Sequence, residues 1–300
     1  MPHQFTPNNF TQQATMKINR LWKLNLQSRF AMPTLAMFAL GIFCLTLTTL
    51  NSSTAVAKLV VQEESEEKTE QEYYELRIYK IWDYEKQQIA ETHLKNALIP
   101  ALNRMGLDRV GVFLNSDVND HSIFVLIPYP TIEKFTKLNK TLAADTEYQT
   151  AAASYFARDK KSPIYKRIES RFMKAFEGMP TMEIPQVSKE KSERIFELRL
   201  YQSHTEDHAR RKVMMFNDGE IQIMRDTKLA PVFFGETLIG PDVPNLIYML
   251  SSPDLESHKA HFKDFLAHPE WKRIKVLEQY KDTVSKIDKW ILKPASYSQF

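Results

Sequence analysis

Hydrophobic residues between about 73 and 293 follow a fixed order of strand-like and helix-like patterns. Residues 73–81 are rich in aromatic and aliphatic side chains, as a strand requires. Apolar residues then recur at helical spacing, at Ala90, Leu94, Ala97, Leu98, Ala101 and Met105. Next come two strand-like runs, over 109–115 and 121–128. A second helix then opens at Thr131, and a last strand follows over about 163–176. This order predicts a β-α-β-β-α-β unit.

The same order returns later in the chain. Three segments match in sequence: Tyr-Glu-Leu-Arg-Ile-Tyr at 74–79 with Phe-Glu-Leu-Arg-Leu-Tyr at 196–201, Ile-Phe-Val-Leu at 123–126 with Ile-Tyr-Met-Leu at 247–250, and Glu-Tyr at 147–148 with Glu-Trp at 270–271. Ordered matches at offsets of 122 to 124 predict a tandem repeat. We expect a leader at 1–57 and an acidic flexible linker at 58–72, followed by the first copy at 73–176. A second linker at 177–193 leads to the second copy at 194–293, and a tail at 294–300 follows it.

The second copy carries its own start signals. Ser203 and Glu206 have the spacing of a capping box before its first helix. Ser252 stands where an N-cap would open its second helix, with Pro253 at the first helical position. Its strands are expected over 194–202, 230–236, 245–251 and about 285–293.

The predicted fold class is α+β, with two tandem ferredoxin-like units. An antiparallel sheet of this kind has helices on one face only, so its other face needs a cover. The second copy can supply that cover, and the two sheets would then pack face to face around a central space.

Alternation along the first strand of each copy separates a polar face from an aliphatic face. Glu75, Arg77 and Tyr79 share one face, whereas Leu76 and Ile78 share the other. The second copy repeats the polar face with Glu197, Arg199 and Tyr201. We expect the aliphatic face to pack on the helices and the polar face to line the central space. There it forms either a structural salt bridge or a polar lining for a ligand.

Histidines supply the other candidates for chemistry. His93 lies at the edge of an apolar helical stripe and could be a haem ligand or a proton-transfer group, although a histidine in such a place is more often a surface or boundary residue. His204 and His208 have the i,i+4 spacing of zinc ligands, but Thr205 and Asp207 break both zinc-protease motifs. We therefore predict no metal site.

The second copy contains family-like motifs. Gly-Glu-Thr-Leu-Ile-Gly-Pro at 235–241, Pro-Asn-Leu-Ile-Tyr-Met-Leu at 244–250 and His-Pro-Glu-Trp-Lys at 268–272 resemble the NIPSNAP family, as do both Glu-Leu-Arg-x-Tyr openings. The resemblance covers about residues 73–293, although the first copy has Tyr148 in place of the tryptophan. It implies a dimeric α+β barrel, a superfamily that includes small monooxygenases and haem-degrading enzymes. NIPSNAP proteins themselves have no well-settled catalytic activity.

The N-terminal segment resembles a secretory signal. Residues 1–57 contain four basic and no acidic residues, an apolar run over 30–50 and a small-residue ending that predicts cleavage after Ala57. This makes the protein secreted or periplasmic. The alternatives are an uncleaved membrane anchor formed by residues 30–50 and a mitochondrial presequence. Translation could start at Met1 or at Met16.

Composition excludes several function classes. The chain has seven glycines and neither GxGxxG nor a phosphate-binding GK[ST] motif, which argues against P-loop and Rossmann enzymes. The single cysteine, Cys44, excludes an internal disulfide and any CxxC motif. Because all four leader cations precede residue 58, the formal charge of +3 becomes −1 after cleavage, and no basic patch for nucleic acid is expected.

These observations favour a binding or assembly role through the barrel, with either a small molecule or a protein as the unidentified partner. The alternative is a monooxygenase-type or haem-binding enzyme that uses the space between the sheets. We expect no cofactor, with haem as the weaker option. Contact with a membrane is expected only through an uncleaved N-terminal segment. The sequence leaves open whether the protein forms a homo-oligomer.

Overall fold

The computed structural model describes residues 70–300, which belong to one compact unit. The expectations for the leader and for most of the acidic linker lie outside the described residues. Within residues 70–300 we find no helix with the length and apolar character that spanning a bilayer requires.

Each copy contains four strands, with helices after the first and the third strand. The first copy comprises β1 (Tyr73–Ile81), α2 (Tyr84–His93), the π-helix η1 (Leu94–Leu98), α3 (Ile99–Arg104), β2 (Gly111–Asn115), β3 (Ile123–Tyr129), α4 (Ile132–Ala144), α5 (Thr146–Phe156) and β4 (Tyr165–Ala175). After α6 (Gln186–Lys189), the second copy comprises β5 (Ile195–Gln202), α7 (Glu206–Met215), the π-helix η2 (Phe216–Glu220), α8 (Ile221–Asp226), β6 (Ala230–Ile239), β7 (Asn245–Ser252), α9 (Leu255–Ala267), α10 (Pro269–Ile274), the short 3-10 helix η3 (Glu278–Tyr280) and β8 (Lys286–Pro294).

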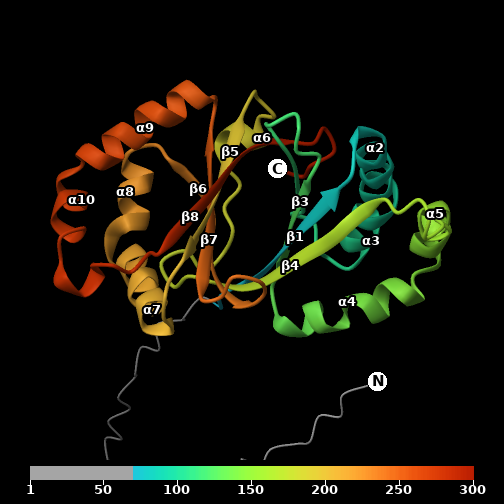
Figure 1. Ribbon diagram of the computed structural model, residues 1–300, viewed down its shortest axis with the longest axis horizontal. Helices are drawn as coiled ribbons and strands as arrows, with labels where there is room; N and C mark the ends of the chain where they lie inside the picture. Colours follow the sequence, from blue (N-terminus) through green and yellow to red (C-terminus); the bar gives the residue numbers. More distant parts are fainter. Residues whose placement is uncertain (1–69) are drawn as a thin grey trace, which may run out of the picture. The chain divides into compact units, whose positions relative to one another are not determined.

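The eight described strands close into one antiparallel barrel (Figure 1). The order around the ring is β1-β3-β2-β8-β5-β7-β6-β4, and β4 pairs with β1 to complete it. Each copy contributes four adjacent strands, and the β2–β8 and β4–β6 pairs join the copies. The predicted α+β class and the barrel arrangement are therefore confirmed, and both joints of the barrel are made within one chain.

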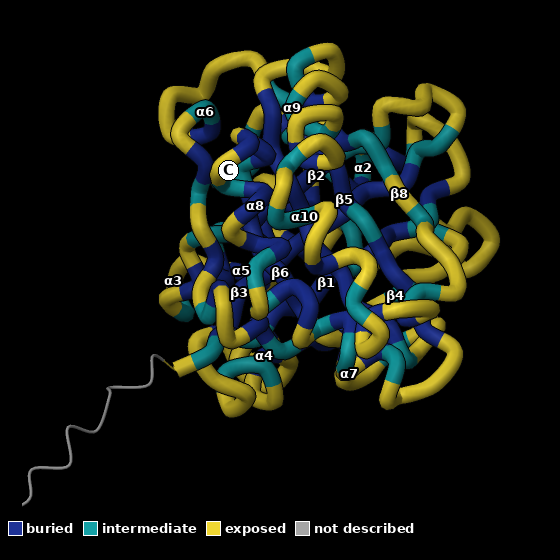
Figure 2. Tube along the Cα trace, turned by 90° about the vertical axis from the view of Figure 1, so that its left-hand side faces the viewer, coloured by how far each residue is buried: buried dark blue, intermediate teal, exposed yellow. Residues whose placement is uncertain are grey.

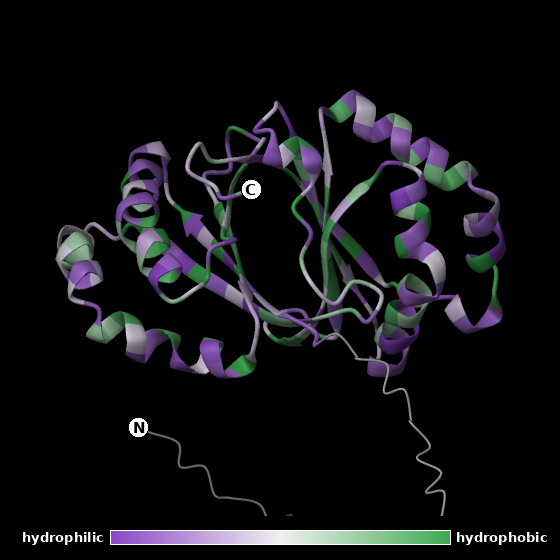
Figure 3. Cartoon of the chain, turned by 180° about the vertical axis from the view of Figure 1, so that it is seen from behind, coloured by the Kyte–Doolittle hydropathy of each residue, from purple (hydrophilic) through white to green (hydrophobic). Residues whose placement is uncertain are grey.

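The barrel interior is apolar, so the expected orientation of the first strands is wrong. Leu76 and Ile78 point into the barrel and share one buried cluster with Leu198 and Leu200 of the second copy. Tyr79 instead joins a separate cluster with the helices of the first copy. Figures 2 and 3 show this arrangement: buried strands surround the centre, and the helices of the two copies lie on opposite outer sides.

The expected orientation is wrong because both faces of each first strand are buried, so burial alone does not decide which face is turned inward. Aliphatic side chains of two copies can fill a shared barrel interior without polar partners. The polar face lies under the helices, where the arginine of each strand and hydroxyl or imidazole groups from other elements pair with its carboxylate. Alternation alone separates the two faces but does not say which one is turned inward.

Two helix starts also differ from the sequence expectation, whereas Thr131 caps α4 as predicted. The N-cap of α9 is Asp254, because Ser252 is still the last residue of β7. The N-cap of α7 is Thr205, since the Ser203 hydroxyl donates a 2.6 Å hydrogen bond to the Thr283 carbonyl instead. In each case a tertiary contact takes the hydroxyl that could have capped the helix.

The 177–193 segment and the C-terminal residues close the barrel end at which β1 and β5 begin. Met182 and Phe300 both belong to the interior cluster. The backbone N–H of Met182 donates to Glu72, just before β1, and the Phe300 ring packs against Phe196 at the start of β5. Side chains from outside the strands thus fill this end of the interior.

Candidate functional site

In the first copy, Glu75 and Arg77 of β1 form an ion pair beneath the helices, and the Glu75 carboxylate has hydrogen-bond donors on both of its oxygens. Glu75 is buried and accepts two hydrogen bonds of 2.8 Å from Arg77. It also accepts one from the Tyr129 hydroxyl at 2.9 Å and one from the Ser170 hydroxyl at 2.7 Å. Burial alone would raise the pKa of Glu75, but Arg77 and the two hydroxyls outweigh it and hold that pKa below its usual value.

In the second copy, the equivalent carboxylate has different partners. Glu197 accepts a hydrogen bond from Arg199 at 3.2 Å and lies 2.9 Å from His258 Nε2. The Nδ1 atom of His258 lies 3.0 Å from the Ser252 hydroxyl. Burial raises the pKa of Glu197, yet the neighbouring His258 and Arg199 bring it below its usual value.

The hydrogen-bonded series Ser252–His258–Glu197 was not predicted from the sequence, because its members do not stand at a spacing typical of any known motif. It has the composition of a hydrolytic triad, but Ser252 is only 2% exposed and no substrate can reach its hydroxyl. We therefore assign it a structural role, as a set of buried polar groups that satisfy one another.

The structure does not bring the two polar triplets together. β1 and β5 lie on opposite parts of the ring, with β3, β2 and β8 between them on one side and β4, β6 and β7 on the other. Glu75, Arg77 and Tyr79 therefore line no space in common with Glu197, Arg199 and Tyr201. Tyr201 instead shares a 2.9 Å hydrogen bond with the Tyr248 hydroxyl inside its own copy.

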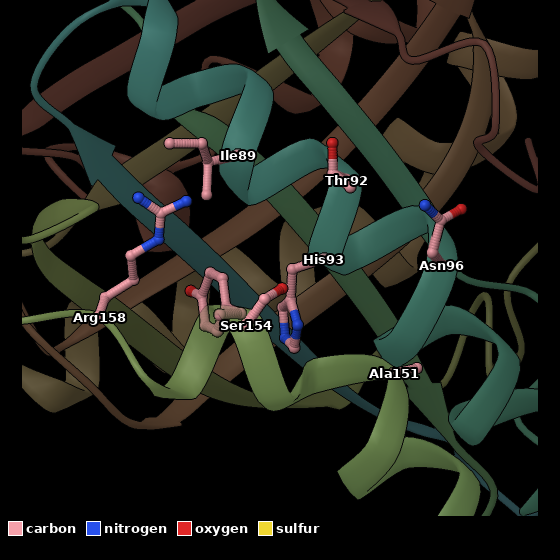
Figure 4. A pocket seen from close by; sticks show the side chains of 8 residues that line it. Ile89, Thr92, His93, Asn96, Ala151, Ser154 and Arg158 are labelled. Carbon is pink, nitrogen blue, oxygen red and sulfur yellow. The ribbon is translucent and has the colours of Figure 1, made fainter.

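His93 is the predicted residue that does line a cavity. It is the last residue of α2, and a space of about 190 Å³ opens beside it between α2–η1 and α5. Figure 4 shows side chains from both sides of this space. The lining residues are Ile89, Thr92, His93, Asn96, Ala151, Ser154, Tyr155 and Arg158. We call this space the His93 pocket.

The imidazole of His93 is held by aromatic rings and makes no hydrogen bond within the described residues. It is 8% exposed and stacks on Tyr155, with ring centroids 3.8 Å apart and planes 10° apart. Its Nδ1 atom is buried without a partner. Burial lowers the pKa of His93 to about 4, because the charged form would lose its hydration. The ring is therefore neutral near pH 7 and keeps one free acceptor nitrogen.

The second copy has the same helix boundaries but different residues at the positions that flank the pocket. α2, η1 and α3 correspond to α7, η2 and α8 residue by residue, at a constant offset of 122. Met215 takes the place of His93, and Lys212 takes that of Ala90. Lys212 is buried, pairs with Glu220 at 2.7 Å and has its ammonium 4.6 Å from the centre of the Phe216 ring. A long ion-paired side chain thus stands in the second copy where the first copy has a buried methyl group.

The other histidines provide no metal site. The rings of His204 and His208 lie 3.8 Å apart, and the Thr205 hydroxyl contacts His208 Nδ1. Among residues 70–300, no group of three or more His, Cys, Asp or Glu is placed to hold a metal ion.

Sequence patterns found His93 but not the residues opposite it. Arg158, Ser154 and Tyr155 come from α5 and the loop after it, some sixty residues further along the chain. No periodicity links the two segments, since their contact depends on how α5 packs against α2. The small side chain of Ala151, which lines the pocket, is the sequence signal that could have suggested the free space.

Comparisons with known proteins agree with this architecture. Residues 196–299 match the model of the NIPSNAP family. Nearly all of the second copy thus matches that family. The resemblance seen in its motifs is thereby confirmed, and a solved NIPSNAP-like domain protein from Burkholderia xenovorans is 24% identical, with a TM-score of 0.33 over 35% of this chain and 89% of that chain.

A longer likeness covers both copies. A candidate monooxygenase from Lactobacillus acidophilus NCFM is 10% identical, with a TM-score of 0.51 over 75% of this chain and 94% of that chain. At this identity the likeness shows the fold, an α+β barrel built from both copies, and nothing about the reaction. No curated protein matches the chain.

Proposed function

We propose that this NIPSNAP-domain protein binds a small molecule in the His93 pocket of its first copy, with the barrel as a rigid scaffold. The observation that carries the proposal is the buried, neutral imidazole without a hydrogen bond beside an open cavity. Buried polar atoms in folded proteins are rarely left unpaired, so an unpaired one beside a cavity marks a place for a ligand group.

The lining supports a polar ligand of modest size. Thr92, Asn96 and Ser154 provide hydroxyl and amide groups around the rim, while Ile89 and Tyr155 provide apolar walls. Known ligand sites combine apolar walls with a few placed polar groups in this way. The neutral imidazole would accept a hydrogen bond from a ligand N–H or O–H group.

The geometry supports binding outside the barrel better than chemistry within it. The space between the sheets is occupied by buried apolar side chains of both copies, including Tyr74, Phe113 and Phe196. A haem group or a substrate placed there would have to displace these packed side chains. The His93 pocket, at about 190 Å³, is also below the usual size of a site for a large cofactor.

Benzamide is a suitable probe, because it combines an aromatic body with an amide that can donate to His93. In the purified full chain with 15N-labelled histidine, we expect benzamide to shift the ring nitrogens of His93 in a saturable way. Ala151→Phe should fill the pocket and weaken binding at least tenfold. Ala153→Phe is the matched control, because Ala153 lies exposed on the same helix but does not line the pocket.

Two results would contradict the proposal. One is binding of benzamide that leaves the His93 nitrogens unmoved. The other is an Ala151→Phe variant that binds as well as the Ala153→Phe control. If both variants fail to fold, their unfolding transitions will show it. The test then uses His93→Met, which carries the residue of the second copy and should lose benzamide binding.

We further propose that the protein is exported by its leader. The support is the order of basic, apolar and small residues in 1–57, with cleavage expected after Ala57. N-terminal sequencing of the protein from its native cells tests this directly. A chain that begins at Lys58 agrees with export, whereas an intact leader in the membrane fraction supports the anchor formed by residues 30–50.

A further inference from the structure

A second cavity adjoins the His93 pocket. It measures about 390 Å³ and lies along the loop between α5 and β4, with Tyr155 and Arg158 in the lining of both spaces. Its apolar wall includes Phe156 and Pro163, and its rim carries Lys160, Lys166 and Arg167. Figure 4 shows the Arg158 guanidinium at the edge of the His93 pocket, on the side where Ile89 lies.

The loop beside this cavity is strongly basic. Between residues 158 and 167 there are five Lys and Arg and a single carboxylate, Asp159. None of the five cations takes part in an ion pair within the part of the chain that the structure describes. Asp159 accepts the backbone N–H of Lys161, and Lys166 lies 4.9 Å from the centre of the exposed Trp82 ring. The near-zero net charge expected for the mature chain therefore conceals a locally basic segment.

The fold does not require this charge. The equivalent segment of the second copy, residues 275–285, carries two lysines against two carboxylates, and Lys281 pairs with Glu278. Both segments connect the last helix of a copy to its last strand. Since the second copy makes the same connection with balanced charges, the excess of cations in the first copy has another cause. Unpaired cations around a concave site raise the local concentration of anions.

We propose that the ligand of the His93 pocket is an organic anion with an apolar body, whose charged group is held at Arg158 with the help of Lys160. This inference rests on the proposed function and names the chemical class that the site takes. An apolar body fits between Ile89 and Tyr155, and a carboxylate, sulfonate or phosphate reaches the guanidinium at the rim. Arg158 suits this role because its planar fork can donate two parallel hydrogen bonds to such a group.

Benzoate and benzamide test the class, because they have the same shape and differ in charge. In the full chain we expect benzoate to bind about tenfold more tightly than benzamide, as one charge-assisted contact provides. Arg158→Gln combined with Lys160→Gln should abolish this preference, because the substituted amides carry no charge to distinguish a carboxylate from an amide. Lys275→Gln removes an exposed, unpaired cation from the equivalent loop of the second copy and should change neither affinity.

The outcomes separate this inference from the proposed function. If benzamide shifts the His93 ring signals but benzoate does not bind more tightly, the anion class is overturned and the proposal of a ligand site in the His93 pocket stands. A benzoate preference lost in the Arg158 and Lys160 variant, with His93 unmoved, supports an anion site and overturns the function proposed for the pocket. The anion class is also overturned if the same two substitutions abolish sedimentation with phosphatidylglycerol vesicles while benzoate binding stays intact, because the cations would then serve a bilayer surface.

Discussion

The first helical segment buries different residues in the two copies, although its element boundaries correspond at a constant offset. In the first copy, Ala90, His93 and Leu98 are buried on α2–η1. In the second copy, the same positions hold Lys212, Met215 and Glu220. The first copy thus has an imidazole beside a pocket, whereas the second has a buried ion pair. A duplicated scaffold can therefore keep its fold while its two copies bury different chemistry.

The strands beneath these helices show the same divergence in a milder form. Glu75 is held by four hydrogen bonds from three residues, whereas Glu197 has one from Arg199 and shares one with His258. Both carboxylates stay ionised under a helical cover because their partners replace the lost water. The Glu-x-Arg-x-Tyr pattern is thus a structural device of the fold, and the partners supplied by other elements differ between copies.

The largest expected effect comes from the ion pair of the second copy. Lys212→Ala removes the cation and leaves Glu220 buried without its partner, since Glu220 is only 3% exposed. The cost of an uncompensated buried charge is about 3–5 kcal/mol of the free energy of unfolding. Equilibrium unfolding in urea measures it as a shift of the midpoint at an unchanged slope.

The double variant Lys212→Ala with Glu220→Leu carries the residues of the first copy at both positions. It should recover most of the lost stability, because no charge is then left unpaired. Equal destabilisation in the single and double variants would show that packing, and not charge pairing, distinguishes the two copies.

The second prediction compares the two strand carboxylates. Glu75→Gln removes the charge that faces Arg77 and should cost about 3 kcal/mol, whereas Glu197→Gln should cost about 2 kcal/mol because fewer partners are lost. Both effects are read from urea unfolding near pH 7. If Glu197→Gln costs more, then the contact with His258 contributes more than the hydrogen bonds from the Tyr129 and Ser170 hydroxyls.

Much of the fold could be predicted, because it depends on local patterns repeated twice. The bounds of β1 are those predicted, Tyr73–Ile81, and every other strand begins and ends within about three residues of its expected range. The internal repeat then supplied the second sheet, and with it the barrel. What the sequence could not show was the direction of the polar strand face, because the partners of Glu75 at Tyr129 and Ser170 come from β3 and β4.

The candidate site was predictable only in part, for a similar reason. His93 stands out as a polar residue at the edge of an apolar stripe, so it was found. The walls of its pocket come from α5 and the loop after it, and their contact with α2 is a tertiary event that no spacing announces. The basic loop 158–167 was visible in the sequence, but averaging its charge over the whole mature chain concealed it.

The third prediction concerns pH and the neutral imidazole. The pKa of His93 is about 4 in the folded chain, whereas an unfolded histidine has a pKa of about 6.5. As the pH falls from 6.5 to 4, the unfolded chain binds a proton that the folded chain does not, so stability decreases over this window. Allowing for partial solvent screening, the decrease is about 2 kcal/mol.

His93→Met, which copies the second repeat, has no such proton and should lack this part of the acid loss. Urea unfolding of both proteins at several pH values between 7 and 4 gives the comparison. Parallel curves for the two proteins would mean that His93 titrates normally, and hence that the imidazole is better hydrated than its burial indicates.

The smallest expected effect isolates a single hydrogen bond. Ser170 lies opposite Arg77 in the β1–β4 pair and donates to Glu75, whereas Lys289 occupies the same register position opposite Arg199 and pairs with no carboxylate in the described residues. Ser170→Ala should cost about 1 kcal/mol at pH 7, and Lys289→Ala should change stability by less than about 0.5 kcal/mol. The serine also helps to lower the pKa of Glu75, and that contribution to stability is present above the unfolded pKa and lost as the pH falls. The cost of Ser170→Ala should therefore shrink in acid. A cost that stays constant down to acidic pH would mean that Ser170 acts through packing of β4 and not through the carboxylate.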